Sequence, residues 1–471
     1  MKILWVICFT ASTVYCIVWC WQNIPIYLQY QTYISTSLIQ EIPTYFPAVS
    51  ICNLKFSNKT KSLKYLSNLL FPNGTPIIKR EDYPIDNVQD YVQYLDLFQQ
   101  QAAISNYYNL TNSASQRNLG YELSDMLYFC SFNWDGCSAN DFSYFYDSFY
   151  GNCFTFNSGT KANGTKVDNI QSAVPGPIYG LSLTLFLGNP TDQSVYQIYG
   201  NGIAVVVHNQ SNFPVFGTRR TMASAGMETD ISINRNFVSY LGAPYGGCLL
   251  DTLKTSAFAS KSPYFDYIVN TQGLSYDQGY CYLICLQDKI ILDCNCSIGL
   301  LPNYGNSTAC TSYFQILCMQ KKVVKFLQNE FPESCVTGCP VSCNFIEYST
   351  KVSSVTYPNE YYKSLLMTTS RVKASNISSS DLDKSFLKVN IFYESMSYTQ
   401  TTENAALTFM TFLSNVGGIF GLFIGVSILS CIELIELICL QTKALIEYKF
   451  GQKIQVEKKK EPITVKADGK S

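Results

Sequence analysis

The sequence predicts a membrane protein with two transmembrane helices and a large, disulfide-rich α+β domain outside the membrane. Two long apolar segments lie near the ends of the 471-residue chain, and only 14% of all residues are charged. An ordinary soluble protein carries about 25% charged residues. The chain also contains 19 cysteines, which is typical of an oxidising compartment. We therefore expect most of the chain to lie outside the cytosol.

The charge balance and the histidine content exclude several classes of protein. The net charge is -1, so no overall basic field attracts a nucleic-acid backbone. His208 is the only histidine, which excludes zinc sites and catalytic motifs that need two imidazoles. We expect no enzyme activity, no cofactor or metal, and no nucleic-acid partner. The segment VVVHNQ predicts that His208 is a structural residue at the end of a strand rather than a ligand.

The first apolar segment covers residues 3–21 and contains 19 positions without a charge. At 1.5 Å per residue it nearly matches a hydrocarbon core of about 30 Å. The alternative is a secretory signal peptide, but no small-residue cleavage site follows the segment. We predict a transmembrane helix, preceded by a residual cytoplasmic N-terminus of residues 1–2.

The second apolar segment, residues 409–440, is too long for one straight span. A continuous helix of its 32 residues would measure about 48 Å, so it must tilt, extend beyond the membrane or break. Four clustered glycines mark the expected break: Gly417, Gly418, Gly421 and Gly425. A Gly-rich face for helix packing explains the same glycines equally well.

Glu433 and Glu436 are the only charged residues of the second segment. A carboxylate at the centre of a membrane helix costs about 2.5–3.5 kcal/mol, and residues at i and i+3 share a helix face. Several subunits with this face around an aqueous path would form rings of negative charge that concentrate cations. The alternative is that both carboxylates lie solvated at the level of the lipid headgroups.

The C-terminal segment fixes the expected orientation. Residues 441–471 contain eight lysines and four acidic residues, which predicts a cytoplasmic C-terminus by the positive-inside rule. With two spans, both termini are cytoplasmic and residues 22–408 lie outside. We expect a two-span protein in the lipid bilayer of the plasma membrane.

The outer segment contains fourteen of the cysteines, an even number that suits seven disulfides. Nine of them lie within residues 281–343, which indicates a narrow element stapled along its length. A zinc cluster is the alternative, but an oxidising compartment without a nearby histidine disfavours it. Eight N-glycosylation sequons also point to the lumenal side: Asn58, Asn73, Asn109, Asn163, Asn209, Asn295, Asn306 and Asn376.

Hydrophobic periodicity places strands and helices in the outer segment. Alternation at residues 181–187 and 389–393 and the apolar run at 202–207 predict strands. Residues 319–331 and 359–367 have the pattern of short helices. A polar, helical stretch between Lys55 and Ser124 looks like a peripheral insertion.

Five segments together resemble the degenerin/epithelial sodium channel family of amiloride-sensitive channels, near its acid-sensing and invertebrate peptide-gated branches. They follow the family order through nearly the whole chain. The segments are FPAVSICN (46–53), GNCFTFN (151–157), residues 202–210, APYGGC (243–248) and LSNVGGIFGLFIGVSILSCIELIE (413–436).

The resemblance implies a homo- or heterotrimer of related subunits, each with a hand-like external domain. The hand has a palm sheet, a β-ball, a finger at about 55–128, a knuckle, and a thumb at about 248–345. The family pattern also implies the disulfide pairs Cys52–Cys153, Cys130–Cys137, Cys248–Cys343, Cys281–Cys339, Cys285–Cys335, Cys294–Cys318 and Cys296–Cys310.

The resemblance further assigns roles in the pore. Gly425, Val426 and Ser427 match the G-x-S selectivity tract, whose carbonyls surround a partly hydrated Na⁺. Glu433 and Glu436 match the acidic pair below the filter. Further family roles fall on Gly421 (amiloride block), Ser414 (a small residue whose enlargement holds the channel open), Asn415 (upper pore) and the pair Tyr30 and Tyr245 (contact of thumb and first helix).

One departure from the family concerns the N-terminus. The family carries a His-Gly motif there, but His208 is the only histidine of this chain. We therefore expect an N-terminally truncated sequence.

The predicted function is a sodium-selective, amiloride-sensitive channel subunit that conducts Na⁺ and is gated by an extracellular ligand, either a peptide or a proton. Mechanical force is the alternative trigger. A cell-surface binding glycoprotein or accessory subunit that does not conduct is the alternative function.

Overall fold

The structure is a computed structural model. It describes residues 2–55, 117–118, 120–147, 150–159, 166, 168–190, 200–215, 220–253, 257–258, 261–298, 301, 304–305, 307–310, 313–328, 332–375, 377–425 and 432–446. The chain divides into two compact units, one of residues 1–33 with 404–471 and one of residues 34–403.

A large mixed sheet forms the centre of the second unit, and β12 is its longest strand together with β13. All of β12 pairs antiparallel with β13 along one edge. Its first half pairs with β14 and its last residues with β15, both parallel. The strand order is β1-β15-β12-β14-β9-β4-β5. The bounds are β1 (Thr32–Gln40), β4 (Leu127–Phe132), β5 (Asp135–Gly136), β9 (Leu181–Phe186), β12 (Met227–Ser239), β13 (Asn344–Thr356), β14 (Phe386–Tyr393) and β15 (Ser397–Ala405).

A smaller five-stranded sheet has the order β11-β10-β3-β7-β6, and β2 pairs with β8 in a two-stranded ribbon. Every residue of β3 and β7 is buried, which explains why their sequences lack the alternation of a half-exposed strand. The bounds are β2 (Thr44–Tyr45), β3 (Ala48–Asn53), β6 (Phe142–Asp147), β7 (Gly151–Phe156), β8 (Gln171–Ser172), β10 (Gly202–His208) and β11 (Thr221–Ser224).

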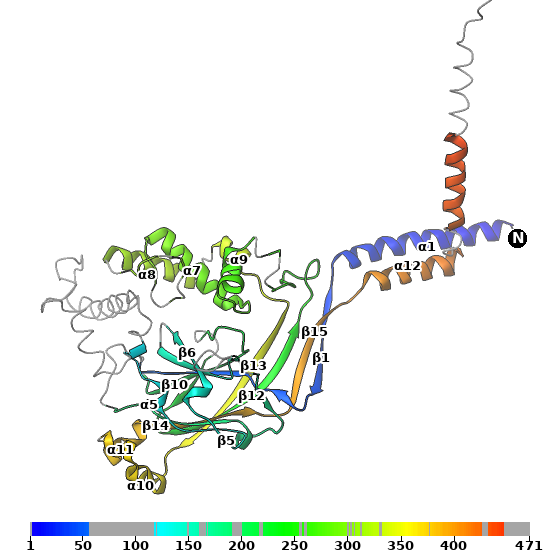
Figure 1. The fold of residues 1–471 in the computed structure, drawn as a ribbon. Helices are drawn as coiled ribbons and strands as arrows, with labels where there is room; N and C mark the ends of the chain where they lie inside the picture. Colours follow the sequence, from blue (N-terminus) through cyan, green and yellow to red (C-terminus); the bar gives the residue numbers. More distant parts are fainter. Residues whose placement is uncertain are drawn as a thin grey trace, which may run out of the picture. The chain divides into compact units, whose positions relative to one another are not determined.

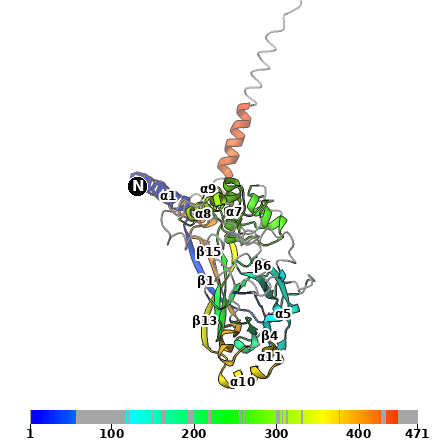
Figure 2. The same cartoon turned by 90° about the vertical axis from the view of Figure 1, so that its left-hand side faces the viewer.

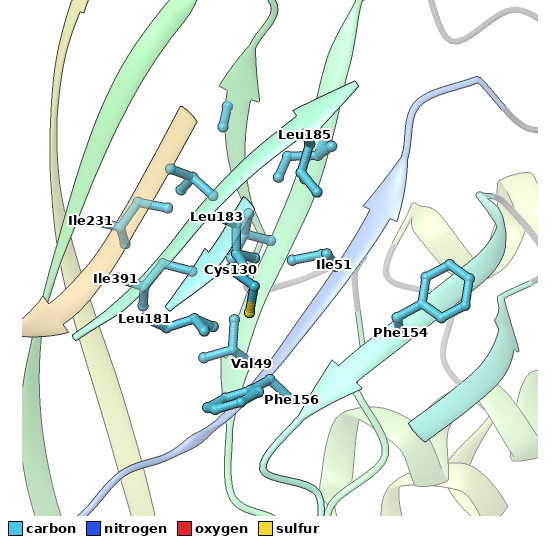
Figure 3. Packing of buried hydrophobic residues seen from close by; sticks show 14 of the residues in the cluster. Val49, Ile51, Cys130, Phe154, Phe156, Leu181, Leu183, Leu185, Ile231 and Ile391 are labelled. Carbon is cyan, nitrogen blue, oxygen red and sulfur yellow. The ribbon is translucent and has the colours of Figure 1, made fainter. Parts of the chain in front are cut away.

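One hydrophobic core joins the two sheets. Leu181, Leu183 and Leu185 of β9 are fully buried, as the leucine alternation predicts. They belong to the same cluster as Val49 and Ile51 of β3, and Figure 3 shows both groups between the strands. The predicted strands at 181–187, 202–207 and 389–393 are confirmed as β9, β10 and β14.

A group of disulfide-linked helices lies at one end of the large sheet, and α10 and α11 lie at the other end (Figures 1 and 2). The first group is α6 (Pro263–Asp266), η5 (Tyr267–Thr271), α7 (Gln278–Cys294), α8 (Tyr313–Leu327) and α9 (Glu333–Gly338). The predicted helix at 319–331 is α8, which begins earlier than expected because Ile316 already packs in the buried cluster, and which ends at Leu327. The other short elements are α5 (Leu123–Met126), α10 (Glu360–Thr368), α11 (Ser370–Ala374), η3 (Ala139–Asp141), η4 (Pro177–Tyr179) and η6 (Ser379–Lys384).

Seven disulfides lie in the second unit, in the pairs that the family resemblance implies. Cys281 and Cys285 are four residues apart and therefore share one face of α7. They pair with Cys339 and Cys335, which joins α7 to α9. Cys294 then joins the last turn of α7 to α8.

The first unit contains α1 (Lys2–Leu28) and α12 (Phe409–Ile424), with a further helical segment at residues 432–446. Among the helices in the described part of the chain, none meets both the length and the apolarity required to cross a membrane.

Candidate functional site

The candidate site lies on α12, and the sequence explains where this helix begins and where it ends. The side chain of Thr408 accepts a hydrogen bond from the backbone N–H of Thr411 at 3.1 Å and caps the first turn. The helix ends at Gly425, which has φ 77° and donates its N–H to the carbonyl of Gly421 at 3.2 Å. A left-handed residue after a helix is most often glycine, because a Cβ is strained there. The predicted break in the apolar segment 409–440 therefore lies at Gly425.

One face of α12 packs against α1. The rings of Tyr27 and Phe412 are stacked with centroids 4.9 Å apart, and Tyr15 lies 4.9 Å from Phe423. Between these contacts, Cys16 is fully buried and its Sγ lies 4.0 Å from the carbonyl of Ile419. The contact face of α12 is therefore aromatic and aliphatic.

The opposite face of α12 carries a line of small residues from Ser414 to the helix end, with the exposed side chains of Met410 before it and Leu422 beside it. Ser414, Gly418, Gly421 and Gly425 follow at intervals of four, three and four residues, which places them in one line along the helix. At 3.6 residues per turn this line lies nearly opposite Phe412, Ile419 and Phe423. Ser414 and the three glycines are exposed in the single chain. α12 therefore presents a stripe without bulky side chains on the side away from α1.

Glu433 and Glu436 lie on the helical segment at 432–446, where i and i+3 positions share a face. Both residues are exposed in the single chain. Of the predicted G-x-S tract, Gly425 closes α12, whereas Val426 and Ser427 lie outside the described residues. Asn415 follows Ser414 on α12 but does not belong to the small-residue stripe, because it is turned by about 100° from it.

The two tyrosines predicted to touch belong to different units. Tyr30 follows α1 with φ 48°, and its N–H donates to the carbonyl of Tyr27 at 3.1 Å. Tyr245 lies in a turn in which its N–H donates to the carbonyl of Gly242 at 3.1 Å. Their contact stays a prediction.

Two of the eight predicted sequons fall on described residues. Asn295 is the left-handed C-cap of α7 and is exposed. Asn209 directly follows β10 and is half-buried. Asn58, Asn73, Asn109, Asn163, Asn306 and Asn376 lie outside the described residues, as does most of the predicted finger insertion.

His208 has the structural role expected of it. It is the last residue of β10, and its Nε2 lies 2.8 Å from the hydroxyl of Ser50, which lies 2.7 Å from the hydroxyl of Thr155. Burial lowers the pKa of the imidazole to about 4, so the ring is neutral at physiological pH. Within the described residues, no cluster of His, Cys, Asp and Glu could hold a metal ion.

One contact of the second unit is not predicted from the sequence: a buried ion pair. Nη2 of Arg235 donates to Oε2 of Glu41 at 2.6 Å, and the Arg235 side chain is only 6% exposed. Its guanidinium also lies 5.2–5.5 Å from the rings of Phe237, Tyr393 and Tyr398. A hydrogen bond from Thr44 and the nearby guanidinium lower the pKa of Glu41. The alternation of Arg235 with Ile231 and Ile233 on β12 places it on the buried face, and that alternation could have revealed it.

Comparison with known proteins identifies the family. The family model for the amiloride-sensitive sodium channel matches residues 1–437. The chain is 30% identical over 329 residues to the epithelial sodium channel subunit beta of Rattus norvegicus, across 68% of this chain and 48% of that protein. It is 26% identical over 390 residues to the beta subunit of Neoceratodus forsteri, across 80% of this chain and 55% of that protein.

A third relative matches more of its own length. The chain is 26% identical over 455 residues to acid-sensing ion channel 1 of Gallus gallus, across 92% of this chain and 78% of that protein. The chain thus spans about half the length of the two epithelial relatives. Since the family model covers most of its residues, this chain belongs to the amiloride-sensitive sodium channel family.

Proposed function

We propose that the chain is a subunit of a sodium-selective, amiloride-sensitive channel in the plasma membrane, and that three related subunits surround the ion path. Family membership supports the channel class. The observation that carries the proposal is the geometry of α12. One face of it is covered by α1, and the opposite face is a stripe of Ser414, Gly418, Gly421 and Gly425 that ends at the helix break.

In this proposal the apolar segments 3–21 and 409–440 cross the bilayer and both termini are cytoplasmic. The charge-free length of the first segment and the lysines of residues 441–471 support this orientation. The seven disulfides of the second unit suit the oxidising side of the membrane.

The end of α12 has the chemistry of a cation site. The last carbonyls of a helix lack intrahelical partners and carry its partial negative charge. Gly425 places no Cβ beside them, and a Cβ there would have no heavy atom within 4 Å in the single chain. Three such helix ends around an axis would offer carbonyl oxygens to a partly hydrated Na⁺. Val426 and Ser427 would continue this filter.

Glu433 and Glu436 would supply the long-range attraction for cations. In a trimer each position repeats three times, so the two carboxylates of each subunit form two charged rings on the shared face. Such rings raise the local concentration of Na⁺ and exclude anions. The cost of placing carboxylates at membrane depth is then offset by water and permeant ions.

We propose that an extracellular ligand, a peptide or a proton, gates the channel through the sheet of the second unit. Chain connectivity supports this coupling: β1 begins at Thr32 shortly after α1 ends at Leu28, and β15 ends at Ala405 shortly before α12 begins at Phe409. β1 and β15 are also hydrogen-bonded neighbours. A ligand that favours one arrangement of these strands would shift the closed and open populations of the helices.

Whole-cell recording tests this function with a matched pair of glycines. We expect an amiloride-sensitive Na⁺ current in response to acid or to one of a panel of peptides, with the chain alone or with related subunits. Gly425→Ala should reduce Na⁺ over K⁺ selectivity at least about threefold, a change of about 0.6 kcal/mol. Gly417→Ala should leave it unchanged, because Gly417 lies eight residues before Gly425, about 12 Å along the helix from the carbonyls of the proposed filter. If the chain reaches the cell surface but gives no current with any trigger or partner, the result would favour a binding glycoprotein that does not conduct.

A further inference from the structure

The second unit contains a cavity of about 790 Å³ beside the turn that follows β10. This volume lies within the range of about 300–1,000 Å³ that is typical of ligand pockets. Its lining is unusual for a structural void, because most of it is polar. The polar residues include Asp168, Asn169, Gln171 and Asn209, and the aromatic ones include Tyr45 and Tyr348.

Asn209 borders this cavity and also two smaller ones, of about 300 and 380 Å³. It is the acceptor residue of the sequon Asn209-Gln210-Ser211. Its backbone is fixed, because its carbonyl accepts from Nδ1 of His208 at 2.8 Å and from the N–H of Asn212 at 3.0 Å. The sequon is thus held at a defined point on the rim of the cavities.

The side-chain amide of Asn209 makes no hydrogen bond to any residue that the structure describes. Buried asparagines elsewhere in the unit use this group: Nδ2 of Asn157 donates to the carbonyl of Phe46 at 2.6 Å, and Nδ2 of Asn152 donates to that of Arg117 at 2.8 Å. A substituent on Nδ2 of Asn209 would therefore break no internal hydrogen bond of the described fold. It would need space, and the cavities provide it.

The walls of the large cavity suit a sugar. A pyranose ring presents hydroxyl groups at its edge and an apolar C–H face, so it needs hydrogen-bonding side chains together with aromatic surfaces. Asp168, Asn169 and Gln171 form no side-chain hydrogen bonds within the described part of the chain. Tyr45 and Tyr348 supply aromatic surface on the same cavity.

We propose that the core of an N-linked glycan on Asn209 occupies this cavity, which rests on the extracellular placement in the proposed function. The transfer uses a lipid-linked oligosaccharide diphosphate as the donor. The bond between C1 of the first sugar and the diphosphate oxygen breaks, a bond forms between C1 and Nδ2 of Asn209, and Nδ2 loses one proton. The lipid diphosphate leaves, and no oxidation or reduction occurs.

The glycan is transferred before the chain has finished folding, which explains how a half-buried asparagine can be modified. As the unit folds, the first sugars then lie between the strand β8, through Gln171, and the strands β12 and β13, through Phe237 and Tyr348. The two smaller cavities are at the lower limit of ligand-sized pockets. The large cavity is therefore the proposed binding site of the glycan.

The exposed sequon at Asn295 provides an internal comparison, because it caps α7 and borders none of these three cavities. The chain is expressed in cells that lack the first N-acetylglucosaminyltransferase, so that all glycans stay substrates for endoglycosidase H. Site-specific glycopeptide mass spectrometry then follows the release of each glycan from the native protein. We expect Asn209 to be glycosylated and to lose its glycan at least about tenfold more slowly than Asn295, as one to two additional hydrogen bonds predict.

A wall variant tests the cavity itself. Asp168→Ala with Gln171→Ala should accelerate release at Asn209 about tenfold, by removal of hydrogen bonds to the sugars, with the thermal melting temperature of the protein unchanged. Gln400→Ala, which borders only the cavity of about 380 Å³, should change neither rate. After denaturation, Asn209 and Asn295 should be released equally fast.

Four results would overturn the inference. If Asn209 carries no glycan while another sequon is glycosylated, the inference is contradicted and the proposed function is unaffected. Equal native release at Asn209 and Asn295, or an unchanged rate in the wall variant, would show that no cavity holds the glycan. Absence of glycans from every sequon would contradict both this inference and the extracellular placement.

Discussion

The guanidinium of Arg235 donates from Nη2 to Oε2 of Glu41 at 2.6 Å, across 194 residues of sequence. The same carboxylate oxygen accepts from the hydroxyl of Thr44 at 2.6 Å. The contact joins β12 at the centre of the large sheet to the segment that follows β1. β1 follows α1 in the chain, so this pair ties the sheet to the strand that leaves the first helix.

We expect Glu41→Ala to destabilise the second unit strongly. It leaves a charged guanidinium that is 94% buried without its partner, and such a change costs about 3–5 kcal/mol. Because Glu41 itself is 39% exposed, we expect the lower end of that range, about 3 kcal/mol. Denaturant unfolding monitored by intrinsic fluorescence measures the loss.

The matched control is the exposed pair of Lys351 and Glu394, whose side chains are 70% and 42% exposed. Lys351→Ala should cost less than about 1 kcal/mol, as exposed ion pairs do. Equal losses in the two variants would contradict the structural role of the Arg235 pair.

The second prediction concerns acid and His208. Burial lowers the pKa of its imidazole to about 4 in the folded protein, whereas an unfolded chain has a value of about 6.5. Between these values the unfolded state binds more protons, so stability falls as the pH falls from about 6.5 to about 4 and then levels off. The total loss is at most about 3 kcal/mol.

His208→Gln removes this titration while an amide stays available to Ser50. Thermal unfolding from pH 7 to pH 4 should therefore show a shallower decline for the variant than for the parent chain. If both declined in parallel, His208 would not be the group that senses acid in this sheet.

The third prediction compares two disulfides in the second unit. Cys52–Cys153 joins β3 to β7 with a sequence separation of 101, whereas Cys130–Cys137 has a separation of 7. In the chain-entropy model, stabilisation grows with the logarithm of loop length, which gives about 4.7 and 2.4 kcal/mol.

Paired Cys→Ala variants at each bridge should therefore differ by about 2 kcal/mol in free energy of unfolding. Calorimetry on the purified protein checks the order. A larger loss at Cys130–Cys137 would mean that local packing, rather than loop closure, determines the effect.

The fourth prediction concerns the carboxylates that follow the helix break in the sequence, Glu433 and Glu436. Glu436→Gln should lower single-channel Na⁺ conductance about twofold at low ionic strength and less at high ionic strength, because salt screens the attraction. Glu457→Gln in the lysine-rich tail should leave the conductance unchanged. A salt-independent effect of Glu436→Gln would place that carboxylate away from the ion path.

The sequence predicted the local elements of the fold better than its long-range contacts. The strands β9 and β14 could be predicted because apolar residues alternate in their sequences. The helix α10 could be predicted because Asn359 caps a helical pattern. The register between β12 and β13 was missed, since most of β13 faces solvent and lacks alternation. The contact of Arg235 with Glu41 depends on the pairing of β1 with β15 and of β15 with β12, which no local pattern encodes.

The candidate site was also only partly predictable. Clustered glycines predicted a break in the second apolar segment, but not which glycine ends the helix. That position depends on the backbone of Gly425, which adopts φ 77°. The even number of cysteines predicted seven disulfides, but their pairing came only from the family resemblance, because spacing does not determine connectivity.

The most direct test of the central claim is cysteine accessibility along α12 during Na⁺ current recording. Ser414→Cys and Gly418→Cys lie on the small-residue stripe, and Val416→Cys lies on the face toward α1. If the stripe lines an aqueous path, a small charged thiol reagent should block current through the first two variants and spare the third. Block of Val416→Cys with the stripe positions unaffected would contradict the proposed pore.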